Sequence, residues 1–188
     1  MKILIVTAHP SGMGFTKRIA EQYKKTSEEI GHKVEVLDLY GKENKQDFLF
    51  FENVREIPFD LSVKKMQEKI LEAREIVFIF PVWWNAEPAI MKNFWDNNMV
   101  AGFAYKYIDE KPKGLLGGKT ARVFMTSDGP IYLQWLLLNP LRRIWSLARL
   151  RFCGIKMKSY TVFDVMRGRD EQNREKLLQM VDMMARQN

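Results

Sequence analysis

Short apolar runs alternate with longer amphipathic segments along almost the whole chain. Five runs rich in β-branched and aromatic residues predict strands, at Lys2–Thr7, Lys33–Leu39, Ile76–Phe80, Thr120–Thr126 and Met157–Phe163. The first of them, KILIVT, shows little alternation of polar and apolar residues. That pattern is typical of strands buried on both faces of a parallel sheet.

Apolar residues at helical spacing predict a helix after each of these strands. The helices are expected over Phe15–Ile30, Ser62–Ala73, Pro88–Asn98, Tyr132–Leu150 (with a break near Pro140) and Asp170–Arg186. The remaining stretches, Gly41–Asp60 and Met99–Gly118, are predicted to be long connections. We see no repeat and no interdomain linker, so residues 1–188 are expected to form a single domain.

Alternating strand and helix units predict an α/β fold, a doubly wound five-stranded parallel sheet with helices on both faces. Ligands of such sheets bind outside the carboxyl ends of the strands, at the topological switch point. The loops after the first, third and fourth predicted strands are therefore the candidates for chemistry.

The loop after the first strand, TAHPSGMGFTKRIA, is rich in hydrogen-bond donors. Backbone amides, a helix N-terminus and the side chains of His9, Ser11 and Thr16 are able to cradle a phosphate, with Phe15 packed beneath. The loop matches neither the dinucleotide-binding nor the Walker pattern. An ordinary turn in which Thr16 or Gly14 caps the helix fits it equally well.

The loop after the third strand, PVWWNAEPAIMKNFWD (Pro81–Asp96), carries two adjacent tryptophans. Trp83 and Trp84 fit a core or a dimer contact as well as a ligand site. The following helix already offers apolar residues to the core, and Pro88 suits its first turn. Two further indoles therefore favour a flat ligand, and an aromatic ring lying on exposed amides is what a flavin site requires.

The loop after the fourth strand, MTSDGPIYLQW, offers hydroxyl and amide donors from Thr126, Ser127 and Gly129. Because carboxyl ends of neighbouring parallel strands lie at one sheet edge, the three loops are expected to form one cleft. The alternative is three unrelated turns.

Composition narrows the class of protein. A formal charge of +7 favours anionic partners such as nucleotide cofactors. The sequence lacks zinc-binding and nucleic-acid-binding signatures, so we expect neither a metal nor nucleic acid. A single cysteine, Cys153, excludes an internal disulfide and fits the cytoplasm. The chain has no apolar run of about 18 residues, so no membrane span is expected.

Taken in order, the motifs HPSGMGFT, FIFPVWWNAEPAIMKNFWD, GFAYKY, GLLGGK and MTSDGP resemble the flavodoxin-like NAD(P)H:quinone oxidoreductases of the DT-diaphorase type. The resemblance runs over most of the chain. It implies FMN as cofactor (FAD is possible), NAD(P)H as co-substrate and a quinone or similar flat acceptor. It also implies hydride transfer with ping-pong kinetics, and a homodimer.

The resemblance assigns residues to each part of the site. His9, Phe15 and Thr16 match the loop that holds the flavin phosphate, and Asp96 matches a position near the adenosine half of FAD. Flavin-ring contacts fall on Pro81, Val82, Trp83, Trp84, Asn85, Thr126, Ser127, Asp128 and Gly129. Trp84 is expected to border the acceptor. Tyr105 and Tyr107 match aromatic residues that close the substrate pocket of the opposite subunit.

Two departures from the family pattern stand out. Asp128 replaces a glycine and brings a negative charge close to the flavin site. The tyrosine and histidine pair proposed to relay protons in some members is missing, since the only histidines are His9 and His32. We therefore assign no catalytic side chain, because the flavin carries the chemistry; water or Tyr132 remain as proton donors.

Two other functions stay open. One is a flavodoxin-type electron carrier, although such proteins are usually acidic. The other is a regulatory subunit of a potassium-efflux membrane protein. In that case Pro130–Arg151, which holds two tryptophans and four arginines, binds a partner or a membrane surface. The simpler interpretation of this segment is a core helix with solvated arginines.

Overall fold

The computed structural model describes residues 1–53, 60–136 and 139–187. Five parallel strands form its main sheet in the order β2-β1-β3-β6-β7. They are β1 (Lys2–Thr7), β2 (Lys33–Asp38), β3 (Glu75–Pro81), β6 (Thr120–Thr126) and β7 (Lys156–Phe163). The predicted flavodoxin-like α/β fold is confirmed, and the strand order reverses between β1 and β3, so ligands are expected there.

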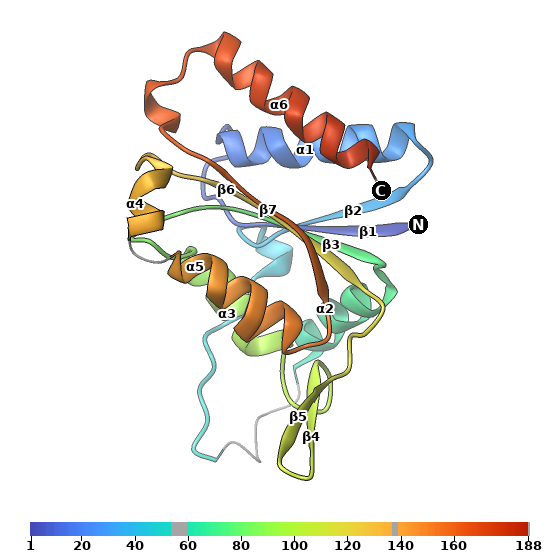
Figure 1. Cartoon of the computed structure of the whole chain (residues 1–188). Coiled ribbons are helices and arrows are strands. Elements are labelled where there is room, and N and C mark those ends of the chain that lie inside the picture. Colours follow the sequence, from blue (N-terminus) through green and yellow to red (C-terminus); the bar gives the residue numbers. More distant parts are fainter. Residues whose placement is uncertain (54–59, 137–138, 188) are drawn as a thin grey trace.

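Helices cover both faces of this sheet (Figure 1). One face carries α1 (Phe15–Glu29) and α6 (Glu171–Arg186). The other carries α2 (Leu61–Glu72), α3 (Ala89–Asn98) and the π-helix η3 (Ile144–Arg151). Within the described ranges, no helix has the length and apolar character needed to cross a bilayer.

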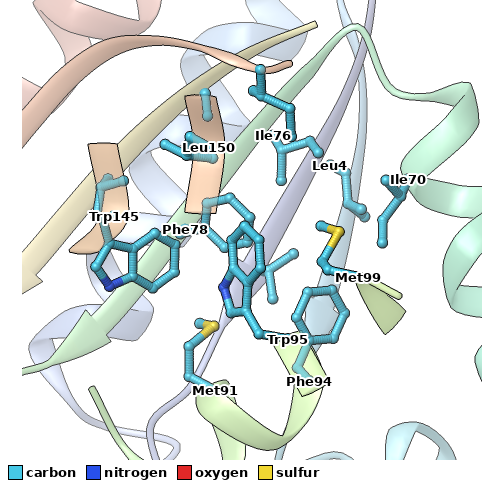
Figure 2. Packing of buried hydrophobic residues seen from close by; sticks show 14 of the residues in the cluster. Leu4, Ile70, Ile76, Phe78, Met91, Phe94, Trp95, Met99, Trp145 and Leu150 are labelled. Atoms are coloured by element: carbon cyan, nitrogen blue, oxygen red, sulfur yellow. The ribbon is translucent and has the colours of Figure 1, made fainter. Parts of the chain in front are cut away.

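Two apolar cores result from the alternation of side chains along the central strands. In β1, Leu4 and Val6 belong to the core under α2 and α3, whereas Ile3 and Ile5 belong to the core under α1 and α6. Every residue of β3 is buried, as expected for the middle strand of a sheet covered twice. Figure 2 shows Trp95 and Trp145 packed around Phe78 in the first core.

The connection Met99–Gly118 differs from the prediction, because it contains a hairpin rather than a plain loop. Its strands β4 (Tyr105–Ile108) and β5 (Lys111–Gly114) pair antiparallel. The turn residues Asp109 and Glu110 both have positive φ, 49° and 61°. Such turns usually carry Asn-Gly or Asp-Gly, and neither stands at Asp109-Glu110, so the hairpin has no local sequence signal.

The predicted break in the fourth helix is confirmed. A short helix α4 (Ile131–Leu136) is followed by α5 (Pro140–Arg143), with Asn139 in the left-handed conformation at φ 54° and Pro140 opening the new helix. Residues 137–138 of the predicted helix, and residues 54–59 of the predicted connection Gly41–Asp60, lie outside the described part. Short 3-10 turns complete the chain at Lys42–Asn44 (η1) and Met166–Gly168 (η4).

Candidate flavin-binding cleft

A cleft of about 470 Å³ opens at the carboxyl ends of β1, β3 and β6. Its volume lies in the range of small-molecule and cofactor sites. Fourteen described residues line it: His9, Phe15, Pro81, Val82, Trp83, Trp84, Asn85, Thr126, Ser127, Asp128, Gly129, Pro130, Leu133 and Met166. The three loops therefore form one cleft, and the alternative of unrelated turns is excluded.

Eleven of the thirteen residues expected at the flavin site lie in this lining. The two outside it are Ser11, which is exposed, and Thr16, which is buried. Sequence analysis missed Pro130, Leu133 and Met166. Pro130 and Leu133 belong to the stretch MTSDGPIYLQW that the sequence already marks as a candidate, whereas Met166 comes from the turn after β7 and carries no sequence signal.

A tight turn displays the two tryptophans. Trp83 and Ala86 exchange two backbone hydrogen bonds of 2.9 Å, and the central residues Trp84 and Asn85 have φ of 51° and 58°. Positive φ costs energy for any residue with a side chain, and it is uncommon for a tryptophan. The Trp84 side chain is completely exposed, and Trp83 is 42% exposed. A core role for either indole is therefore excluded.

The first loop brings the ring of His9 against the start of α1. The Ser11 amide donates to His9 Nδ1 at 3.0 Å, and the ring lies so close to Gly14 that a Cβ there would come within 2.5 Å of it. Gly14 is also the N-cap residue of α1, and it supplies no side-chain cap. The helix N-terminus thus stays open to an external acceptor.

Thr16 adds an unsatisfied hydroxyl to this helix end. Its side chain is 1% exposed, and Oγ1 has no hydrogen-bond partner among the residues that the structure describes. Buried polar atoms are normally paired, so an orphaned hydroxyl in the first turn of a helix points to a missing acceptor. A phosphate at the N-terminus of α1 would supply one.

The loop after β6 is held from two sides. The Val82 amide donates to the Thr126 carbonyl at 2.7 Å, and Ser127 Oγ donates to the Gly129 carbonyl at 3.0 Å. Asp128 accepts a 3.0 Å hydrogen bond from the Arg167 amide and pairs with the Arg167 guanidinium at 3.2 Å. The carboxylate that departs from the family pattern is thus paired with a cation at the cleft edge.

An ion pair beneath the tryptophan turn fixes its position. Glu87, just after the turn, pairs with Arg149 of the π-helix, and both side chains are largely buried. The Arg149 guanidinium also lies over the rings of Trp95, at 5.4 Å, and Trp145, at 4.9 Å. The largely buried Arg149 therefore links the tryptophan turn to two aromatic residues of the core.

The other expected residues lie elsewhere. Tyr105 and Asp96 line a second cavity of about 760 Å³, and Asp96 pairs with Lys92 at 2.6 Å. Tyr107, 61% exposed on the hairpin, is 5.9 Å from Tyr105 between ring centres. Neither tyrosine lines the cleft of its own chain.

Cys153, the single cysteine of the sequence, is not a reactive thiol in this structure. Burial raises the pKa of the Cys153 thiol to about 11, so this cysteine stays protonated near neutral pH. In the described ranges, no group of three His, Cys, Asp or Glu side chains is arranged to hold a metal ion. The cleft has the donors and the apolar walls for an aromatic phosphate ester.

Comparison with known proteins gives the family. The sequence model of the family with the flavodoxin-like fold matches residues 1–184. The chain belongs to this family. The match confirms the resemblance seen in the motifs, and it covers the cleft together with the whole sheet.

Named relatives are oxidoreductases. An uncharacterized NAD(P)H oxidoreductase of Haemophilus influenzae is 28% identical over 188 residues, covering 96% of this chain and 92% of that protein. An FMN-dependent NADH:quinone oxidoreductase of an Exiguobacterium species is 32% identical over 148 residues, 70% of this chain and 69% of that protein. The structure of an NAD(P)H:quinone oxidoreductase from Methanothermobacter marburgensis superposes with a TM-score of 0.86 at 26% identity, covering 99% and 96% of the two chains.

Proposed function

We propose that this protein is an FMN-dependent NAD(P)H:quinone oxidoreductase whose 188 residues form one flavin-binding domain. The observation that carries the proposal is the cleft at the switch point of the sheet, which is lined by the fully exposed, strained Trp84 and by the donor-rich loop after β1. Relatives with FMN-dependent and NAD(P)H-dependent names support it.

The residues present fit FMN. The open N-terminus of α1, with the orphaned Thr16 hydroxyl, suits the phosphate. The backbone of Pro81–Asn85 and the Ser127–Gly129 loop both line the cleft, and their amides would hold the isoalloxazine ring. The donor set is one for a monophosphate ester and a flat heterocycle, and we favour FMN over FAD for that reason.

Bound FMN supplies the redox chemistry, taking two electrons as hydride from NAD(P)H and giving them to the acceptor. The residues that line the cleft would hold the ring, and the exposed Trp84 would be available to contact a second ligand beside it. If both substrates bind in this one cleft, the oxidised nucleotide would have to leave before the acceptor enters, which predicts ping-pong kinetics. The net charge of +7 steers nucleotide phosphates toward the protein.

We also propose a homodimer in the cytoplasm. Tyr105 and Tyr107 are on a hairpin away from the cleft of their own chain, where they are available to a second copy. Cytoplasmic location is supported by the single buried cysteine, which suits a reducing compartment.

The proposal is tested by steady-state oxidation of NADH and NADPH by the FMN-loaded protein with a soluble quinone. Initial rates over a grid of both substrate concentrations should give parallel double-reciprocal lines. Turnover that requires added carrier protein would support an electron carrier instead. A protein that binds FMN but shows no turnover with either nucleotide would point to a regulatory subunit.

A further inference from the structure

Asp128 is the one carboxylate among the described residues that line the cleft. It lies two residues after the end of β6, next to Ser127, whose amide donates to the Phe163 carbonyl of β7 at 2.9 Å, and its side chain is 55% exposed. A carboxylate at this place bears on any group bound in the cleft that gains electrons, because negative charge opposes a further gain of negative charge.

The carboxylate is held by the turn after β7. Asp128 Oδ1 accepts the Arg167 amide at 3.0 Å, and Oδ2 lies 3.2 Å from the Arg167 guanidinium. The neighbouring Met166 amide donates to the Ser127 carbonyl at 3.1 Å. Met166 and Arg167 of the turn after β7 thus form hydrogen bonds with the consecutive residues Ser127 and Asp128 of the loop after β6.

This turn is held in a strained conformation. Val165, the residue before it, has a φ of 52°, which is a genuine outlier for a β-branched side chain. Strain of this kind persists only where surrounding contacts over-determine the backbone, and it gathers at functional sites. The contacts from Ser127 and Asp128 serve that purpose and aim the Arg167 guanidinium at the cleft edge.

We propose that Asp128 and Arg167 form a charge pair that sets the reduction potential of the flavin bound in the cleft. The inference rests on the proposed function. The carboxylate lowers the potential, and the guanidinium offsets it, so the pair as a whole leaves the site close to neutral. Charge beside a flavin ring is one of the means by which a protein tunes it.

The test is the midpoint potential of bound FMN, measured by redox titration against reference dyes, together with FMN affinity. The isosteric Asp128→Asn keeps an oxygen acceptor for the Arg167 amide but removes the charge. It should favour reduced over oxidised FMN by about threefold to tenfold, and tenfold raises a two-electron potential by about 30 mV. Arg167→Gln should shift the preference about as far in the opposite direction, because it leaves the carboxylate uncompensated.

Two controls separate charge from structure. Arg167→Lys keeps the positive charge and should retain the wild-type potential. Arg186→Gln removes the same charge from another aspartate pair, Arg186–Asp182, at the end of α6 that lies near the N-terminus (Figure 1), and should leave the potential unchanged. The double variant Asp128→Asn with Arg167→Gln should return close to wild type.

The outcomes are distinct. Equal potentials in the wild type, Asp128→Asn and Arg167→Gln, with FMN bound in all three, would overturn this inference and leave the proposed function standing. Weaker FMN binding in both single variants at an unchanged potential would assign the pair a purely structural role and overturn it too. Failure of the unaltered protein to bind FMN would overturn both.

Discussion

Trp84 combines full exposure with a backbone conformation that glycine adopts at little cost. Replacing it by Ala removes the indole and keeps the strain, whereas replacing it by Gly removes both. We therefore expect Trp84→Gly to be more stable than Trp84→Ala by about 1 kcal/mol. Thermal unfolding of the flavin-free proteins measures the difference, which amounts to about 2–4 °C for a chain of this length.

Both Trp84 variants should lose acceptor use by several-fold to about tenfold, since aromatic contact adds about 0.5–1.5 kcal/mol beyond burial. The fold should stay intact, because a side chain in solvent leaves no cavity when it is truncated. Large destabilisation of Trp84→Ala in the flavin-free state, or unchanged turnover in both variants, would remove this residue from the site.

Removing the Thr16 hydroxyl should stabilise the flavin-free protein but weaken its binding of FMN. Thr16→Val keeps the shape and deletes a buried hydroxyl that has no partner among the described residues. The flavin-free protein should gain about 1 kcal/mol in unfolding free energy, while FMN affinity should fall by about 1.5–3 kcal/mol because a hydrogen bond to a charged group is lost.

Riboflavin, which lacks the phosphate, is the matched ligand for this variant. Calorimetric titration should give equal riboflavin affinity in wild type and Thr16→Val, and Thr16→Ser should keep most of the FMN affinity. An equal loss for both ligands would separate Thr16 from the phosphate.

Among the elements, β3 begins with a carboxylate that interacts with residues of three neighbouring elements, α1, β6 and β7. Glu75 is fully buried and accepts from Tyr23 of α1 at 2.5 Å, Thr120 of β6 at 3.2 Å and Lys158 of β7 at 2.7 Å, with Arg122 at 3.6 Å. Burial alone would raise the pKa of this carboxyl, but the hydrogen bonds and cations outweigh it, so the pKa lies below its ordinary value.

A lowered folded-state pKa means that the unfolded chain takes up the proton first as the pH falls. The stabilisation by Glu75 is therefore complete above the unfolded pKa of about 4.3 and is lost as the pH falls through the folded value. The melting temperature of wild type should exceed that of Glu75→Gln at neutral pH, and the gap should close in acid. Glu68→Gln, an exposed change on α2, should show no such closing gap. A gap that is constant with pH would exclude the titration.

Some elements could be predicted from the sequence and others could not. The five strands and both cores follow from apolar runs and alternation, because burial on a covered sheet leaves a strong pattern. Hairpin β4–β5 was not predicted, since Asp109 and Glu110 adopt positive φ without the usual glycine or asparagine. Met166 reaches the cleft only because β7 lies beside β6, a tertiary fact with no local signal.

At the scale of the whole molecule, large apolar side chains remain exposed beside the cleft and on the hairpin. Tyr132, Trp135 and Leu136 of α4 are 62–75% exposed, and Tyr107 is 61% exposed. Patches of this kind mark interaction sites on soluble proteins. We expect a C₂ dimer in which the hairpin of one subunit reaches the cleft of the other, as C₂ pairs are the commonest homo-oligomers.

Light scattering should give the mass of two chains for the unaltered protein and of one chain for Trp135→Glu, with a parallel loss of quinone reduction. The same change at Met183, 56% exposed on α6, is the matched control and should remain dimeric and active. A monomer with full activity would contradict this assembly.

The most direct measurement of the central claim follows the visible absorption of the FMN-loaded protein without oxygen. One equivalent of NAD(P)H should bleach the flavin band, and one equivalent of a soluble quinone should then restore it, with no other protein present. A protein that binds no FMN, or whose flavin band is bleached by dithionite but not by NADH or NADPH, would contradict the account.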